Sequence, residues 1–393
     1  MWSSLSLLGL AACSSICSAT SISSPLALYG RHTAGLSADK LAKIRDNAYA
    51  VTNQSWEYGT LLEALTELEW PSLSVFAGKA VNTESLNSWS PIATDVVTLA
   101  TQIVNNKTHS ELPLIDGAGA TGDPASIGIA VLLTNWTLPR WSDDKEFAVA
   151  AEEQLYYLLN VAPRGDNGAI SQRVSQVQLW SDAVYMFPPF LAYYGALQSN
   201  FSLLYESYNQ VKLYRETLLD PNGTGLWRHI ELGTSIDNHL WGTGNGWAAM
   251  GMMRVLQTIA DSDFSEELRS EQDDLVWWIG DLLDATWKYQ GENGTLFNYV
   301  NDPSSISDTS TTAMIASATY RFATFNDNRK HIEAADQAYQ LVVDSINQDG
   351  WLLNAVDPLL WNVHETPGSW SPEAQSFVLL VHAAWRDFHN ARV

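Results

Sequence analysis

The stretch Trp180-Ser181-Asp182-Ala183-Val184-Tyr185-Met186-Phe187-Pro188-Pro189-Phe190 carries a single carboxylate among aromatic and apolar residues. A second cluster, rich in tryptophan and glycine, follows at Trp241-Gly242-Thr243-Gly244-Asn245-Gly246-Trp247. An acid in apolar surroundings tends to have a raised pKa, which a general acid working near neutral pH requires. The two stretches therefore suggest carbohydrate chemistry, with Asp182 as the candidate acid.

Apolar residues recur at three- and four-residue spacing through this stretch and along the rest of the chain, interrupted by clusters of Gly, Pro, Asn and Asp. Such segments in consecutive pairs predict an all-α fold, an (α/α)6 barrel, in which six helical hairpins close a ring around a funnel. An open α-solenoid would show similar periodicity, but no tight repeat consensus is visible. The loops 163–180 and 221–245 are expected to converge on one end and to carry the chemistry. The predicted helices cover residues 37–52, 56–69, 93–105, 125–135, 144–161, 181–198, 201–219, 245–260, 264–290, 309–324, 329–347 and 371–391.

Composition restricts the class of partner. The 393 residues are 46% hydrophobic and 17% charged, so the chain can bury a large core in one big domain or two ordinary ones. A formal net charge of −23, with no run of Lys or Arg, excludes nucleic acid and anionic membranes as partners. The 17 Trp and 15 Tyr exceed what such a core needs, and flat aromatic faces suit the stacking of sugar rings. For any single Trp, an ordinary place in an aromatic helical core remains an equal alternative.

The N-terminus reads as a processing signal, because Leu5 to Ala12 is apolar and small residues follow at Ser18-Ala19. We therefore expect a signal peptide at residues 1–19, a single domain at 20–393, secretion, and no membrane association after signal removal. A bacterial lipoprotein site at Cys13 is the alternative. Cys13 and Cys17 are the only cysteines, so no disulfide is expected in the mature chain. Glycosylation sequons, which favour a eukaryotic secretory route, begin at Asn53, Asn106, Asn135, Asn200, Asn222 and Asn293.

Helix-start chemistry offers a structural alternative for the candidate acids. Ser37, Asp123-Pro124, Asp182 and Ser371-Pro372 each place an oxygen acceptor or a proline where a helix has free N–H groups. An Asp at such a position is stabilised as an anion, which would lower its pKa and oppose a role as acid.

Other chemistries find little support in the sequence. The glycines of the 241–247 cluster resemble a dinucleotide loop, but no strand precedes them and their spacing is wrong. No Gly-x-Ser-x-Gly elbow occurs, and the eight His have no metal-site spacing, so neither a metal nor a cofactor is expected. The acidic pairs Asp143-Asp144 and Asp273-Asp274 read as solvated faces or caps, although paired aspartates also serve some mannan-cleaving (α/α)6 enzymes.

The stretch around Asp182 resembles the catalytic-helix motif of the unsaturated rhamnogalacturonyl hydrolases, glycoside hydrolase family 105, which is related to the unsaturated glucuronyl hydrolases of family 88. The 241–247 cluster is similar to the Trp-Gly-Arg-Gly-Asn-Gly-Trp signature of that family. Further matches, in the family's order and across most of the mature chain, are Trp56-Glu57-Tyr58, Asp123 with Gly128, Pro163-Arg164 with Gly168, and Thr309-Ser310-Thr311-Thr312-Ala313-Met314.

The resemblance implies an (α/α)6 barrel that removes an unsaturated uronic acid from the non-reducing end of lyase-generated oligosaccharides. Asp182 would protonate C4 of the C4=C5 double bond and then help water to add at C5, after which the hemiketal collapses. This hydration does not need the paired carboxylates of ordinary glycosidases. Asp123 would be the second catalytic carboxylate, which tunes charge and holds geometry. The resemblance also implies substrate-binding roles for Tyr58, Gln172, Arg173, Met186, His229, Trp241, Thr243, Asn245 and Trp247.

Three departures from the family pattern bear on the substrate. Thr243 stands where the signature has Arg, so a uronate would lose a bidentate partner, a task that Arg173 or Arg228 would have to take over. Gln172-Arg173 replaces a His-Lys pair, and Asp308 replaces a Glu. The expected partner is an oligosaccharide, bound by a monomer. The alternatives are a glycosidase of the same fold that acts on a saturated uronide or a neutral sugar, and a non-catalytic carbohydrate-binding barrel.

Overall fold

The computed structural model describes residues 35–78, 93–107, 112–137 and 146–391. They belong to one compact unit, which begins at Ala34. The expected signal peptide at residues 1–19 and both cysteines lie outside the described residues.

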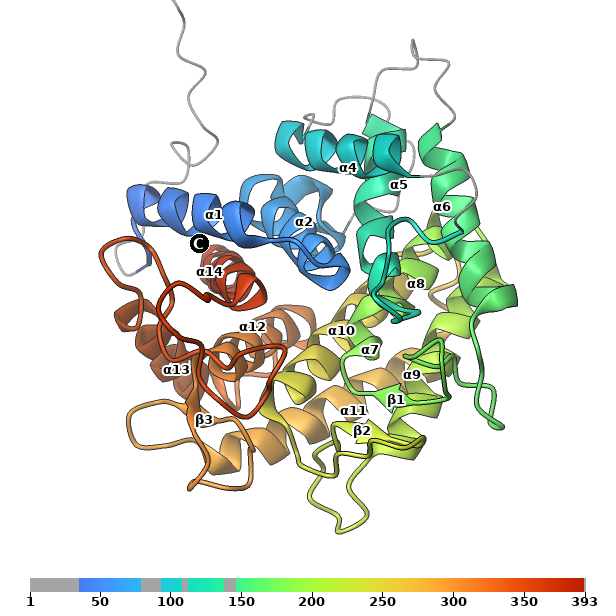
Figure 1. The fold of residues 1–393 in the computed structure, drawn as a ribbon. Helices are drawn as coiled ribbons and strands as arrows, with labels where there is room; N and C mark the ends of the chain where they lie inside the picture. The colour runs from blue at the N-terminus through green and yellow to red at the C-terminus, as the bar shows by residue number, and fades with distance from the viewer. Residues whose placement is uncertain (1–34, 79–92, 108–111, 138–145, 392–393) are drawn as a thin grey trace, which may run out of the picture. The chain divides into compact units, whose positions relative to one another are not determined.

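Six helical hairpins form a closed ring, as the periodicity predicted (Figure 1). In each hairpin an outer helix is followed by an inner one. Each inner helix packs against the next, and the last packs against the first, so the inner ring is closed by contact. In ring order the inner helices are α2 (Ser55–Glu69), α5 (Gly128–Thr137), α8 (Pro188–Leu197) preceded by the short α7 (Ala183–Met186), α10 (Gly242–Ala260), α12 (Thr309–Asn326) and α14 (Pro372–Asn390).

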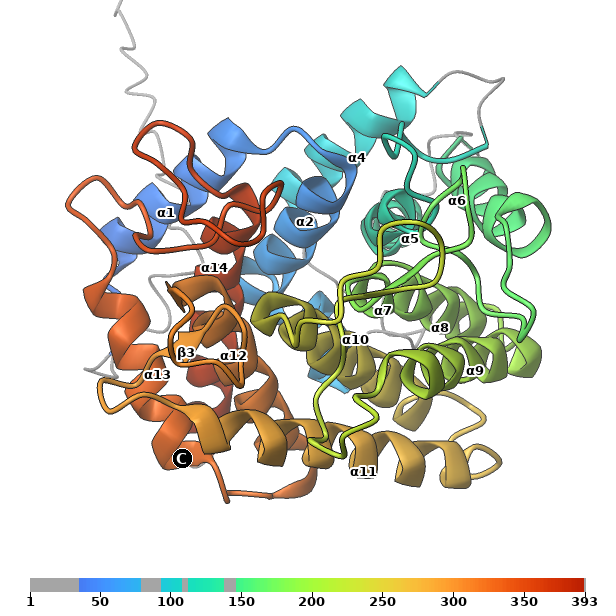
Figure 2. The same cartoon turned by 60° about the horizontal axis from the view of Figure 1, so that its bottom comes forward.

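The outer helices lie outside this ring, and Figure 2 shows α9 and α11 on the outside of α10. They are α1 (Ala38–Val51), α4 (Thr94–Asn106), α6 (Glu146–Tyr156), α9 (Phe201–Leu218), α11 (Arg269–Thr286) and α13 (Ile332–Asp344). Short connecting turns complete the chain: η2 (Pro71–Leu73), η3 (Val75–Ala77), η4 (Asp123–Ile127), the π-helical turn η5 (Tyr157–Val161) and η6 (Trp287–Tyr289).

Two small antiparallel pairs join the loops that follow helices of the ring. Strand β1 (Leu179–Trp180) pairs with β2 (Ile230–Glu231), with Trp180 opposite Ile230. Strand β3 (Leu296–Phe297) pairs with β4 (Ser307–Asp308). The first pair fixes the chain immediately before Asp182 against the segment that carries His229.

The residue pattern explains which helices are inner and which are outer. Nearly every residue of α10 and α12 is buried, because their sequences are apolar or small on all sides, as a helix enclosed by others requires. Helices α4 and α13 bury one face only and expose their polar residues. None of the helices in the described part of the chain is both long and apolar enough to cross a membrane.

The structure corrects two details of the predicted elements. The segment 181–198 is not one helix, since it breaks at Phe187, where Pro188 begins α8. A proline lacks the N–H that would continue α7, and it disfavours the helical conformation of the residue before it. The helix expected at 245–260 begins earlier, at Gly242, so the first part of the 241–247 cluster lies in α10 and not in the expected loop 221–245.

Glycines place the first turns of α10 against neighbouring helices. A Cβ at Gly242 would lie 2.4 Å from Thr311 Oγ1, one at Gly244 would lie 2.3 Å from Ser181 Oγ, and one at Gly246 would lie 2.8 Å from Met314 Cβ. The glycines therefore serve close helix packing rather than a turn.

A buried network of charges joins four inner helices farther along the ring axis than the first turns of α10. Glu67 of α2 pairs with Arg254 of α10 and, at 2.6 Å, with Arg321 of α12. Arg386 of α14 donates to the carbonyl oxygens of Glu67 and Leu68 at 2.9 Å and 2.6 Å. The side chains of Glu67, Arg254 and Arg321 are each at most 3% exposed, so each charge depends on its partners for solvation.

Candidate active site

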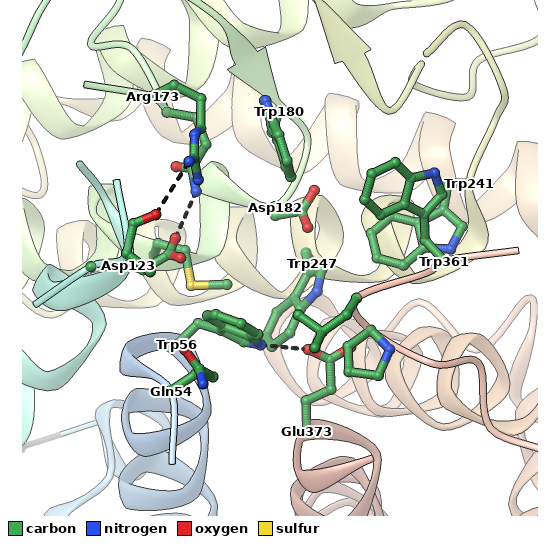
Figure 3. Close-up of a pocket in the computed structure, with 16 residues that line it drawn as sticks. Gln54, Trp56, Asp123, Arg173, Trp180, Asp182, Trp241, Trp247, Trp361 and Glu373 are labelled. Carbon is green, nitrogen blue, oxygen red and sulfur yellow. Dashed lines mark hydrogen bonds between the residues drawn. The ribbon is translucent and has the colours of Figure 1, made fainter. Parts of the chain in front are cut away.

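A cavity of about 240 Å³ lies at the end of the ring where the inner helices begin (Figure 3). Helices α2, η4, α7, α10 and α14 each supply a lining residue from the first turn or from the residue just before it. Helix N-termini present free N–H groups and partial positive charge, so this end of the ring favours an anionic ligand. The lining residues are Gln54, Trp56, Gly117, Ala118, Asp123, Gln172, Arg173, Trp180, Asp182, Met186, Trp241, Trp247, Pro358, Leu359, Trp361 and Glu373.

Asp182 lies in this lining, with its side chain 16% exposed. It occupies the position before α7, but its φ of −59° and ψ of −38° are helical, whereas a capping residue needs an extended conformation. Its Oδ2 accepts a hydrogen bond from Ser181 Oγ at 3.2 Å and lies 3.7 Å from His229 Nε2. Burial raises the pKa of Asp182 above its usual value, and His229 opposes part of this rise. The capping alternative is therefore wrong for this residue.

His229 is buried and contacts Asp182, but it does not line the cavity. Its Nδ1 lies 2.9 Å from Asp237 Oδ2, and the other oxygen of Asp237 lies 2.5 Å from Nδ1 of the exposed His239. Burial alone would raise the pKa of Asp237, but its hydrogen bonds to His229 and His239 lower the pKa to about 2. An ionised Asp237 holds the proton of His229 on Nδ1, which leaves Nε2 facing Asp182.

Asp123 is buried opposite this group, as the first residue of η4. Gln172 Nε2 donates a hydrogen bond of 2.7 Å to its Oδ1. Burial raises the pKa of Asp123 to about 7, and the charge of Asp182 adds to the rise. The carboxyl group faces Gln172 rather than the start of the helix, so the capping alternative is wrong here also.

A third carboxyl group, that of Glu373, enters the cavity from α14. Glu373 is 2% exposed, and Trp56 Nε1 donates to its Oε2 at 2.9 Å. Glu373 follows directly on the helix start expected at Ser371-Pro372, and its position in the sequence did not indicate a role in the cavity. Its partner Trp56 lies 317 positions away, and only closure of the ring brings the two together.

The structure gathers several of the other expected substrate-binding residues at this cavity. Gln172, Arg173, Met186, Trp241 and Trp247 all line it. Arg173 donates to the carbonyl oxygen of Ala118 at 3.2 Å, and its guanidinium lies 5.9 Å from the centre of the Trp180 ring.

Four expected residues lie outside the lining. Asn245 is fully buried and bonds the backbone of Trp227 and Trp241, and Thr243 is fully buried against Asp308 and Thr311. His229 contacts Asp182 without lining the cavity, and Tyr58 lines a separate cavity of about 200 Å³. Arg228, named as a possible replacement for the missing arginine, pairs with Glu231 instead.

The loop before α14 also lines the cavity, and the sequence did not predict this. Pro358, Leu359 and Trp361 line the cavity, and Trp361 packs edge-on against Trp180 with ring centroids 6.2 Å apart. This loop has no helical periodicity, and Trp361 is one of 17 tryptophans in the chain. The only signal in the sequence was the position of the loop directly before the last predicted helix. Among the described residues, no group of three or more His, Cys, Asp or Glu side chains is arranged to hold a metal ion.

A ring of six hairpins that ends in a cavity of tryptophans and carboxyl groups defines a six-hairpin (α/α)6 glycosidase. The sequence profile of Glycosyl Hydrolase Family 88 matches residues 97–357 of the chain. The protein therefore belongs to this family and is a glycoside hydrolase.

Known relatives agree with this assignment. The chain is 24% identical to the unsaturated rhamnogalacturonyl hydrolase YesR of Bacillus subtilis (strain 168) over 293 residues, which cover 72% of this chain and 77% of YesR. The structure is similar to that of a possible GH105 member from Klebsiella pneumoniae, with a TM-score of 0.71, 15% identity, and coverage of 92% of this chain and 97% of the other. A family 105 hydrolase from C. acetobutylicum gives a TM-score of 0.65 at 15% identity, with coverage of 88% and 99%. These structures bear out the fold, and the resemblance found in the sequence is confirmed.

Proposed function

We propose that the protein hydrolyses unsaturated uronides, with Asp182 as the general acid and base. The observation that carries this proposal is the carboxyl group of Asp182, which lines the cavity free of any capping role and is held between Ser181 and His229. Desolvation raises the pKa of this carboxyl group, which favours the protonated form that the first step requires.

In the proposed reaction, Asp182 transfers its proton to C4 of the C4=C5 double bond, and positive charge develops at C5 and the ring oxygen. Water adds at C5, and Asp182 takes back one of its protons, so the acid is restored. The hemiketal at C5 opens as its bond to the ring oxygen breaks, and the next sugar leaves from C1 as an alcohol. The positive charge of a protonated His229 would stabilise Asp182 in its ionised form between the two proton transfers.

Asp123 and Gln172 would hold the second side of the sugar. With a pKa near 7, Asp123 is largely protonated at mildly acidic pH, which limits its repulsion of an ionised Asp182 across the cavity. Gln172 fixes one oxygen of this carboxyl group, so the other can contact a substrate hydroxyl.

Two features at this end of the ring support an acidic sugar as the substrate. Helix N-termini converge on the cavity, and among the described residues that line it Arg173 is the one cation. These features favour a sugar with a carboxylate. YesR is an unsaturated rhamnogalacturonyl hydrolase, and we propose lyase products of pectin-like polymers as substrates of this protein too.

The test is to follow the ultraviolet absorbance of the double bond while the purified protein acts on unsaturated galacturonyl and glucuronyl disaccharides. We expect the wild type to bleach this absorbance. The Asp182→Asn variant should lose about 10²- to 10⁴-fold in kcat, the range for a general acid, with an unchanged circular dichroism spectrum.

Asp166→Asn, in an exposed loop, is the matched control and should keep full activity. Unchanged absorbance with the whole panel would refute the proposal. Release of saturated uronides or neutral sugars would then identify the alternative glycosidase, and binding without turnover would identify a carbohydrate-binding barrel.

A further inference from the structure

Glu373 has a place in the cavity that the proposed reaction does not use. It is the second residue of α14, and in Figure 3 its carboxyl group points from this helix toward Trp56 and the side of the cavity that carries Asp182. The indole of Trp56 occupies Oε2, whereas Oε1 is buried and has no hydrogen-bond partner among the described residues. An unpaired oxygen at the wall of a ligand cavity costs free energy unless a bound ligand forms a hydrogen bond with it.

The groups around Glu373 are mainly acidic. The charges of Asp182 before α7, Glu57 of α2 and Asp308 before α12 all disfavour its ionised form, whereas the hydrogen bond from the Trp56 N–H favours it. Burial, followed by the charge of Asp182, raises the pKa of Glu373 well above its usual value. Because Oε2 already accepts from Trp56, the proton of the neutral acid resides on Oε1.

A neutral carboxylic acid with one oxygen fixed as an acceptor presents the other as a donor. Such a donor forms its strongest hydrogen bond with an ionised acceptor, so a substrate carboxylate is the partner that fits it best. An ionised Glu373 would instead repel a carboxylate and prefer the hydroxyl groups of a neutral sugar.

We propose that Glu373 is a specificity-determining residue, which donates a hydrogen bond from Oε1 to the carboxylate of the uronic acid. This inference rests on the proposed function. It names a group that recognises the acidic substrate in place of the family arginine, whose position Thr243 occupies here. Thr243 is buried against Asp308 and lies outside the cavity lining.

The test compares three variants by calorimetric titration with galacturonate and with galactose, which differ in the carboxylate. Glu373→Gln keeps an acceptor for Trp56 and places a permanent NH2 donor where Oε1 stood. Glu373→Met has similar volume and no donor. The control is Glu333→Gln, because Glu333 is the exposed acid in the first turn of α13, as Glu373 is in the first turn of α14.

We expect Glu373→Met to weaken galacturonate binding by about tenfold or more, the loss of one charge-assisted hydrogen bond, and to leave galactose binding unchanged. The wild-type affinity for galacturonate should fall as the pH rises through the raised pKa of Glu373, because the donor is present only below it. Glu373→Gln should show a smaller fall, since its amide donates at every pH and only Asp123 and Asp182 still ionise among the acids that line the cavity. With the unsaturated disaccharide, Glu373→Met should raise KM and change kcat little.

Equal galacturonate affinity in the wild type and Glu373→Met would overturn the inference, as would the same pH dependence in the wild type and Glu373→Gln, or no preference of the wild type for galacturonate. These titrations do not depend on turnover. A wild type that binds galacturonate as expected but leaves the double bond intact would therefore refute the hydrolase proposal and support the role of Glu373.

Discussion

His229 can influence the proposed reaction through Asp182, although it does not line the cavity. The aromatic rings of Trp180 and Trp241 pack against its imidazole, with centroids 5.6 Å and 4.4 Å away, and Asp237 fixes its orientation. The imidazole therefore presents the same nitrogen to Asp182 throughout the proposed reaction. Asp237 is a positioning residue in this arrangement, since it acts on Asp182 only through His229.

Replacement of Asp237 by Asn tests this chain of contacts. An amide stabilises a protonated His229 less than a carboxylate does, and we expect kcat to fall about 10- to 100-fold with little change in KM. The pH profile of kcat should also shift, because His229 would no longer stabilise the ionised Asp182. His239→Gln is the control, as this ring is 60% exposed and should matter little. Equal losses in both variants would contradict the positioning role.

The sequence could identify Asp182 but could not show what its side chain does. The choice between a helix cap and a free acid depends on the backbone angles of that one residue, which the sequence does not show. Glu373 and Trp361 were not predicted as site residues, for another reason. They come from the last helix and the loop before it, and the closed ring alone brings them to Asp182.

At the scale of the elements, the start of α10 controls the position of the acid. Gly244 lets this helix approach Ser181, the residue that hydrogen-bonds Asp182. The helix was expected to begin at residue 245. Glycines are weak helix formers, but packing against α12 and the Ser181 segment outweighs that propensity, and the helix begins at Gly242.

Gly244→Ala should therefore impair both stability and activity. Its Cβ would lie 2.3 Å from Ser181 Oγ and 3.0 Å from the Trp241 ring, and overpacking of this kind costs about 1–3 kcal/mol. Gly280→Ala is the matched control inside α11, since the nearest heavy atom to its Cβ would be Phe322 at 3.7 Å. We expect it to stabilise the protein by about 0.5–1 kcal/mol. Urea denaturation and kcat measure both effects, and a neutral Gly244→Ala would contradict the packing account.

At the scale of the whole chain, the helical periodicity sufficed to predict the six hairpins, but not the charges inside them. Glu67, Arg254 and Arg321 lie on helices that the pattern treats as apolar, and each residue on its own resembles a surface position. Their burial follows from ring closure, which makes every face of an inner helix an interior face.

Glu67→Gln tests how much the ring depends on this network. The change leaves Arg254 and Arg321 buried with too little negative charge, and breaking a buried pair costs about 3–5 kcal/mol. Glu266→Gln removes one partner of an exposed pair with Arg269 and should alter the free energy of unfolding by less than about 0.5 kcal/mol. Chemical denaturation followed by circular dichroism compares them, and similar midpoints would argue against a structural role of the network.

The same network has a consequence for how the enzyme meets its substrate. Glu67 lies 11 residues after Trp56 on one helix, about 16 Å farther along the axis at 1.5 Å per residue. Behind Trp247, the Tyr185 ring and its bond to Glu63 fill the space between the cavity and these charges. These side chains fill the axis of the ring beneath Trp247, so we infer that a polymer is not threaded through the ring. We expect the rate on long chains to scale with the number of chain termini rather than with the mass of polysaccharide, since the proposed reaction removes one terminal sugar at a time.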